Sequence, residues 1–155
     1  MAKMTAYSSV AGLNKALRRL PKQASAELRE ASVVIARKVA DQASQRASST
    51  GGVARLVAPT LTATRDRVPV VKMGGSRRLP DHGAGWEHSR SGSRQTVGDV
   101  IWGAEFGGGK RRTTQQFLPH LGTTGYFLWP TVRALGHDIH EEYSEALDDA
   151  LQAMR

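Results

Sequence analysis

The feature that most constrains this fold is a long run of helical periodicity between residues 21 and 48. Apolar side chains recur there at steps of three or four residues, which keeps one face of a helix apolar. Pro21 suits the first turn of such a helix, and the run Ser48-Ser49-Thr50-Gly51-Gly52 is typical of a helix end. About 27 residues at about 1.5 Å each predict a rod of about 40 Å. The apolar positions are Ala24, Leu28, Ala31, Ile35, Val39, Ala43 and Ala47.

Changes of period predict the remaining elements. Alternating and β-branched residues between positions 60 and 71 predict two antiparallel strands, and Pro69 places the second strand at an edge. Alternation over residues 97–106 predicts a third strand. Upstream of Pro21, the spacing of Val10, Leu13, Leu17 and Leu20 predicts a short leading helix. From Thr131 onward, a second amphipathic helix is predicted by the apolar face Val132, Leu135, Ile139, Tyr143, Leu147, Leu151 and Met154.

These elements fit within one domain that spans residues 1–155. The chain has 155 residues, of which 39% are apolar, and this length excludes two full domains. No apolar stretch approaches the roughly 20 residues of a membrane span, so we expect a soluble protein. We expect an α+β fold in which a small, mainly antiparallel sheet is packed by the long N-terminal helix and the C-terminal helix. Six aromatic residues are spaced as core positions: Trp102, Phe106, Phe117, Tyr126, Phe127 and Trp129.

Glycine marks the irregular part of the chain. Ten of the 16 glycines lie between positions 74 and 109. Residues 74–98 carry few large apolar side chains, so they bury too little surface to offset an ordering entropy of about 1–2 kcal/mol per residue. We therefore expect a long, flexible, basic loop at about residues 74–98.

Charge is segregated along the chain. The net charge is +8, but the first 136 residues hold 21 basic and 8 acidic residues, whereas the last 19 hold one basic and six acidic residues. This pattern favours docking on a specific partner over uniform coating of a polyanion. The basic loop residues form either a surface that faces DNA phosphates or an ordinary solvated surface, and no helix-turn-helix or zinc finger indicates sequence-specific binding. The DNA-facing candidates are Arg77, Arg78, Arg90, Arg94, Lys110, Arg111 and Arg112.

Patterns for catalysis are incomplete. The absence of cysteine excludes disulfides, thiolate metal sites and a cysteine nucleophile. His82, Glu87 and His88 are the candidates for an alternative function, a small metal-dependent nuclease or another nucleic-acid-acting protein. His137 and His140 could share a divalent metal, but no third ligand is marked. No cofactor motif is complete, so no cofactor is expected.

Two segments in the C-terminal half resemble the motifs of a known family. The first is Trp102-Gly103-Ala104-Glu105-Phe106-Gly107, and the second follows Phe117-Leu118-Pro119 and reads Phe127-Leu128-Trp129-Pro130-Thr131-Val132-Arg133-Ala134. They are similar to segments of phage and prophage head–tail joining or tail-completion proteins, typified by the gp-ten-like minor tail protein of lambdoid coliphages. In that family a strand ending in alanine-x-glutamate-phenylalanine-glycine precedes a phenylalanine-leucine-x-proline-alanine entry to a C-terminal helix. The order of the predicted elements also agrees.

The resemblance implies a structural, non-enzymatic neck protein of the virion, assembled in the host cytoplasm. Such a protein would form a ring of six or twelve copies and act in tail completion or tail termination. Its partners would be a stopper or adaptor protein, the tail-tube protein and the passing DNA, and no membrane. Glu105 would be an interface carboxylate or a buried partner of Arg133 or of a neighbour's arginine. Glu141, Glu142 and Glu145 would dock on a basic surface of an adjoining subunit.

Overall fold

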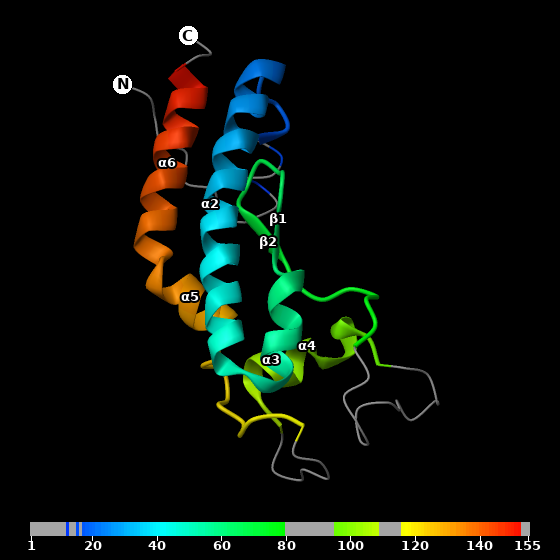
Figure 1. Ribbon diagram of the computed structural model, residues 1–155. Coiled ribbons are helices and arrows are strands. Elements are labelled where there is room, and N and C mark those ends of the chain that lie inside the picture. Colours follow the sequence, from blue (N-terminus) through cyan, green and yellow to red (C-terminus); the bar gives the residue numbers. More distant parts are fainter. Residues whose placement is uncertain (1–11, 13–14, 16, 80–94, 109–115, 153–155) are drawn as a thin grey trace.

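The computed structural model describes residues 12, 15, 17–79, 95–108 and 116–152 and is mostly helical (Figure 1). The long helix α2 (Lys22–Thr50) has α6 (Gly136–Gln152) along one side and the hairpin of β1 (Thr62–Thr64) and β2 (Val70–Lys72) along the other. This arrangement confirms the predicted α+β fold with a long N-terminal helix. The remaining elements gather near the C-terminal end of α2 and are α3 (Gly52–Val57), the 3-10 turn η1 (Ala58–Thr60), α4 (Val97–Phe106) and α5 (Leu128–Ala134).

Helix α2 buries the apolar face that the sequence predicts. Leu28 and Ala43 are fully buried, and Ile35 is almost so. The carbonyl of Pro21 accepts a hydrogen bond from the Ser25 N–H at 2.9 Å, so the proline stands at the first turn where its missing N–H costs nothing. The many alanines of this face leave room for α6 and the hairpin to approach the helix backbone closely.

The hairpin is held to both long helices through its turn. Its two strands pair in antiparallel register, with Thr62 opposite Lys72. In the turn, the Arg67 carbonyl accepts hydrogen bonds from the Ser32 hydroxyl at 3.1 Å and from the Tyr143 hydroxyl at 3.0 Å. The prediction of two antiparallel strands is therefore confirmed, and tertiary hydrogen bonds fix the position of the short sheet.

The predicted third strand, residues 97–106, is wrong: this segment is helix α4. Val97, Val100 and Ala104 face the core, which is helical spacing. At the start of the helix, the Thr96 backbone N–H and hydroxyl each donate to the Asp99 carboxylate at 2.8 Å, a capping-box arrangement. Gly107 ends the helix with a φ of 82°, a left-handed conformation that favours glycine.

The predicted C-terminal helix is two helices. Leu135 lies between α5 and α6 with φ −94° and ψ 2°, and Gly136, a poor helix former, follows it. The apolar face continues across the break, because Leu135 is buried while Tyr143 and Leu147 are half-buried. The bend lets α5 pack across the end of α2 while α6 returns along its length (Figure 1).

Two predictions lie partly outside the described residues. Of the predicted leading helix, the structure describes a helical Leu17 that is buried against Leu28 and Ala150. Of the predicted loop at 74–98, residues 80–94 are outside, whereas the ends of the loop are paired. The Leu79 N–H donates to the Gln95 carbonyl at 3.0 Å, so the described ends of the loop are closed by backbone hydrogen bonds.

Candidate functional site

The described residues contain one buried carboxylate, Glu105 on α4, and it organises the end of the molecule where α4 and α5 meet. Its side chain is 1% exposed. The two carboxylate oxygens accept hydrogen bonds from the backbone N–H groups of Leu128 and Trp129, both at 2.9 Å, and from that of Phe127 at 3.3 Å. Glu105 therefore caps the N-terminus of α5 from another helix.

The local sequence explains why α5 needs this carboxylate. Phe127 occupies the N-cap position and has no side-chain acceptor for the first N–H groups of the helix. Those N–H groups and the positive end of the helix dipole favour a negative charge at this place. The hydrogen bonds offset the cost of removing the carboxylate from water.

The predicted pairing of Glu105 with Arg133 is wrong. The Arg133 guanidinium instead donates to the backbone carbonyls of Thr123 and Thr124. Glu105 is buried, and its side-chain partners among the described residues are backbone N–H groups. Its predicted place at an interface, or beside an arginine of a neighbouring copy, stays a prediction.

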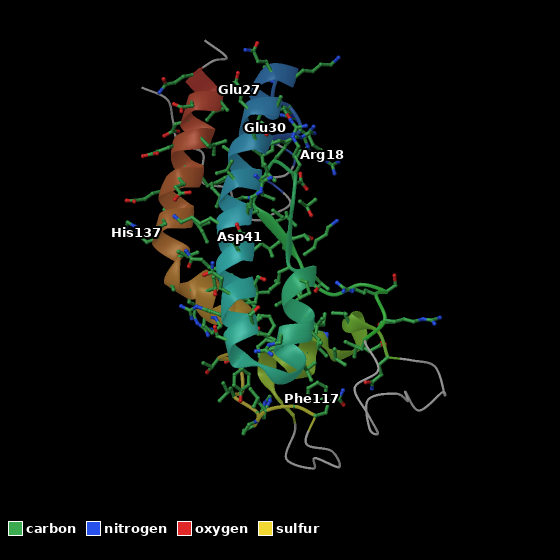
Figure 2. The ribbon with its side chains drawn as sticks, in the orientation of Figure 1. Arg18, Glu27, Glu30, Asp41, Phe117 and His137 are labelled. Carbon is green, nitrogen blue, oxygen red and sulfur yellow. The ribbon has the colours of Figure 1, made fainter. Side chains whose placement is uncertain are left out.

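Glycines allow the close approach of the two segments that carry the family resemblance. Gly125 has a φ of 74°, and a Cβ there would collide with a carboxylate oxygen of Glu105. Gly107, at the end of α4, lies directly against the Pro119 carbonyl, and Gly103 lies under the ring of Phe117. Figure 2 shows Phe117 at this end of the molecule, beside α4. Residues 103–107, 117–119 and 125–129 thus form one compact unit, which we call the Glu105 cap.

The outer side of the Glu105 cap exposes large apolar side chains. Trp102 is 70% exposed and stacks on Phe106, with ring centroids 5.8 Å apart and an interplanar angle of 16°. Leu118 and Leu121 are also exposed, and the Leu121 N–H donates to the Phe106 carbonyl at 3.0 Å. The prediction that the six aromatics are core residues holds for the fully buried Phe127 and is wrong for the exposed Trp102 and Trp129. The other three, Phe106, Phe117 and Tyr126, are half-buried. Exposed apolar clusters of this kind mark contact surfaces for other macromolecules.

The acidic helix α6 uses part of its charge within the chain. Lys38 of α2 donates to Glu142 at 2.7 Å and to Asp138 at 3.4 Å, and the hydrogen bond to Glu142 is the main cause that raises the pKa of Lys38. Glu141 pairs with His137 on the same helix at 3.4 Å, and Glu145 is exposed. Glu142 is therefore a contact between α2 and α6, whereas Glu141 and Glu145 point their charge to solvent.

The other predicted site residues fall into two groups. Arg77 and Arg78 are exposed, and Arg78 forms an isolated antiparallel bridge with Thr96. His137 and His140 are exposed on α6, and the described part of the chain contains no group of three potential metal ligands. The following candidates lie outside the described residues: His82, Glu87, His88, Arg90, Arg94, Lys110, Arg111 and Arg112.

Comparison with family models, curated proteins and solved structures finds no match to this chain. Within the described ranges, no helix has both the length and the apolar character needed to cross a membrane.

Proposed function

We propose that this chain is a structural neck protein of a long-tailed bacteriophage or prophage, which forms a ring that completes the tail and joins it to the DNA-filled head. The observation that carries the proposal is the Glu105 cap. The two segments that resemble the head–tail joining family lie far apart in the sequence, yet they meet through the three hydrogen bonds to Glu105. The first segment is helical in this chain, whereas the family pattern has a strand there, so the support comes from the contact between the two segments.

The surface next to the Glu105 cap supports a role in assembly. Trp102 is 70% exposed, and its stacking on Phe106 restricts the positions that its ring can take. Binding through such a side chain loses little conformational entropy. Tryptophan is also enriched among the residues that dominate the free energy of protein–protein contacts.

The charge distribution supports a ring of copies. The exposed acids of α6 belong to a segment of net charge −5, and the first 136 residues carry +13. Opposite charges on two different surfaces of one chain favour contacts between unlike surfaces of neighbouring copies, and such contacts form a ring when the rotation between copies closes. Arg77 and Arg78 are exposed and would make salt-dependent contacts with the phosphates of passing DNA.

Inactivation of the gene in the phage or prophage that carries it tests this proposal. We expect electron micrographs of lysates to show DNA-filled heads and separate tails, and a plasmid copy of the gene to restore joined particles. Complete, infectious particles without the protein would refute the neck role. Neighbouring genes for portal, capsid, adaptor and tail-tube proteins are a further expected observation.

A charge-reversal variant tests the docking role of α6. Glu141→Lys combined with Glu145→Lys changes exposed charges only, so we expect a folded protein that fails to join heads to tails. Glu142 is left unchanged because it pairs with Lys38 inside the chain. Glu27→Lys, an exposed position on α2, is the matched control. Normal joining by the double variant would show that α6 is only a solvated face.

A further inference from the structure

An open apolar groove runs between α2, β2, α5 and α6. Its volume is about 320 Å³, and the residues that line it are all of apolar type. Ala36 and Val39 of α2 form its floor, and Trp129 and Ile139 contribute to the wall made by α5 and α6. Trp129 is 46% exposed at this wall, so the groove leaves a large ring in contact with water.

The volume of the groove distinguishes between kinds of occupant. An apolar cavity of about 150 Å³ holds one benzene molecule, so about 320 Å³ holds about two aromatic rings. One turn of an α-helix with its side chains is a cylinder about 10 Å wide and about 5.4 Å long, about 420 Å³. The groove therefore suits inserted side chains better than a whole docked helix.

The same chain offers two stacked rings for this space, of which Trp102 is exposed and Phe106 is half-buried. Trp102 and Phe106 are stacked, and Trp102 does not line the groove of its own copy. The charged residues near the two surfaces have opposite signs. Asp99 stands three residues before Trp102 on α4, and Arg133 stands four residues after Trp129 on α5, so each charged residue shares a helix face with its ring. Both charged residues are exposed, although Asp99 also caps α4 and Arg133 also donates to the carbonyls of Thr123 and Thr124.

We propose that the groove of one copy receives the stacked Trp102 and Phe106 rings of a second copy, with Asp99 of that copy near Arg133. This is a head-to-tail contact between unlike surfaces, and repetition of it generates a closed ring or an open filament. It deepens the proposed function by naming the contact between copies, and it rests on that function only for the choice of a second copy as the occupant.

Photocrosslinking tests the contact in the full chain. A benzophenone amino acid at position 102 keeps an aromatic ring there, and mixing isotopically heavy and light copies identifies links between copies by mass spectrometry. We expect links from position 102 to peptides of α5, α6, β2 or the middle of α2, the elements that line the groove. Links only between two copies of position 102, links to other surfaces, or no links between copies would overturn the proposal.

Sedimentation of the purified protein gives the second measurement. We expect self-association to weaken at least about thirtyfold in Trp102→Ala, the loss typical of a dominant interface tryptophan. Val34→Ala is the matched control, since Val34 is 60% exposed on α2 and does not line the groove. Equal weakening by both variants, or a wild-type protein that stays monomeric at millimolar concentration, would refute the contact. If the contact fails while loss of the gene still separates heads from tails, the neck role stands and only the occupant is wrong.

Discussion

Replacing Glu105 with alanine should destabilise the protein more than any exposed substitution. The change removes the acceptor for three backbone N–H groups at the start of α5. Glu105 is 1% exposed, and its hydrogen bonds are buried at Phe127 and partly buried at Leu128 and Trp129, so water compensates for the lost acceptor only in part. The variant therefore leaves buried and partly buried N–H groups incompletely paired, and it opens a space where the carboxylate stood.

The expected cost follows from these losses. One buried donor left without a partner costs about 1–3 kcal/mol, and hydrogen bonds to a charged acceptor are at the upper end of the range. The three bonds share one carboxylate and are not additive, and the variant also avoids the cost of burying a charge. We expect a net loss of about 3–5 kcal/mol, a large share of the roughly 5–15 kcal/mol that stabilises a typical domain.

Urea unfolding followed by circular dichroism measures this loss, and the combined fluorescence of the three tryptophans gives a second probe of unfolding. Glu105→Gln separates charge from shape, because its amide keeps one acceptor oxygen but turns an N–H₂ group toward the donors. We expect it to fall between wild type and the alanine variant. Glu141→Ala, which removes an exposed acid paired with His137, is the control.

Two results would contradict this account of Glu105. If Glu105→Ala unfolds within about 0.5 kcal/mol of wild type, as exposed changes do, the cap contributes nothing to stability. If glutamine restores full stability, the negative charge is irrelevant and only the shape of the side chain matters.

Three further predictions concern neighbouring features. Gly125→Ala should destabilise the fold much more than Gly122→Ala, because both have positive φ but only the first would meet Glu105, and the two midpoints in urea compare them directly. Thr96→Ala should lower the free energy of unfolding by about 1 kcal/mol, because it removes the N-terminal cap of α4. Hydrogen bonds from the Thr96 backbone and hydroxyl lower the pKa of Asp99, so this carboxylate stabilises the fold above its unfolded pKa. That stability is lost as pH falls below about 4. Unfolding curves measured over a range of pH should therefore show that acid lowers the free energy of unfolding less in Thr96→Ala than in wild type. Burial raises the pKa of Tyr143, so the unfolded chain ionises first and stability should fall above about pH 10 in wild type but less in Tyr143→Phe.

Local patterns were sufficient for the long helix and for the hairpin. Leu28, Ile35 and Val39 recur at a spacing that only a helix can bury on one side, and 29 residues of α2 follow it. Local patterns did not identify the segment 97–106 as a helix, because a short apolar run fits both a strand and a helix. Its boundaries held the deciding signal: Thr96 and Asp99 can cap a helix, and Gly107 can end one.

Tertiary structure alone decided the role of Glu105 and of Trp102. In the sequence, Glu105 is an acid beside aromatic residues, and nothing local indicates that its partners are backbone groups 22 to 24 positions away. Trp102 has the composition of a core residue, yet the core side of α4 is filled by Val97, Val100 and Ala104, which turns the tryptophan outward. Periodicity depends on neighbours along the chain, so the sequence determines it directly. The partner of a buried charge and the exposed side of a helix depend on which segments pack together, and that is settled only when the whole chain folds.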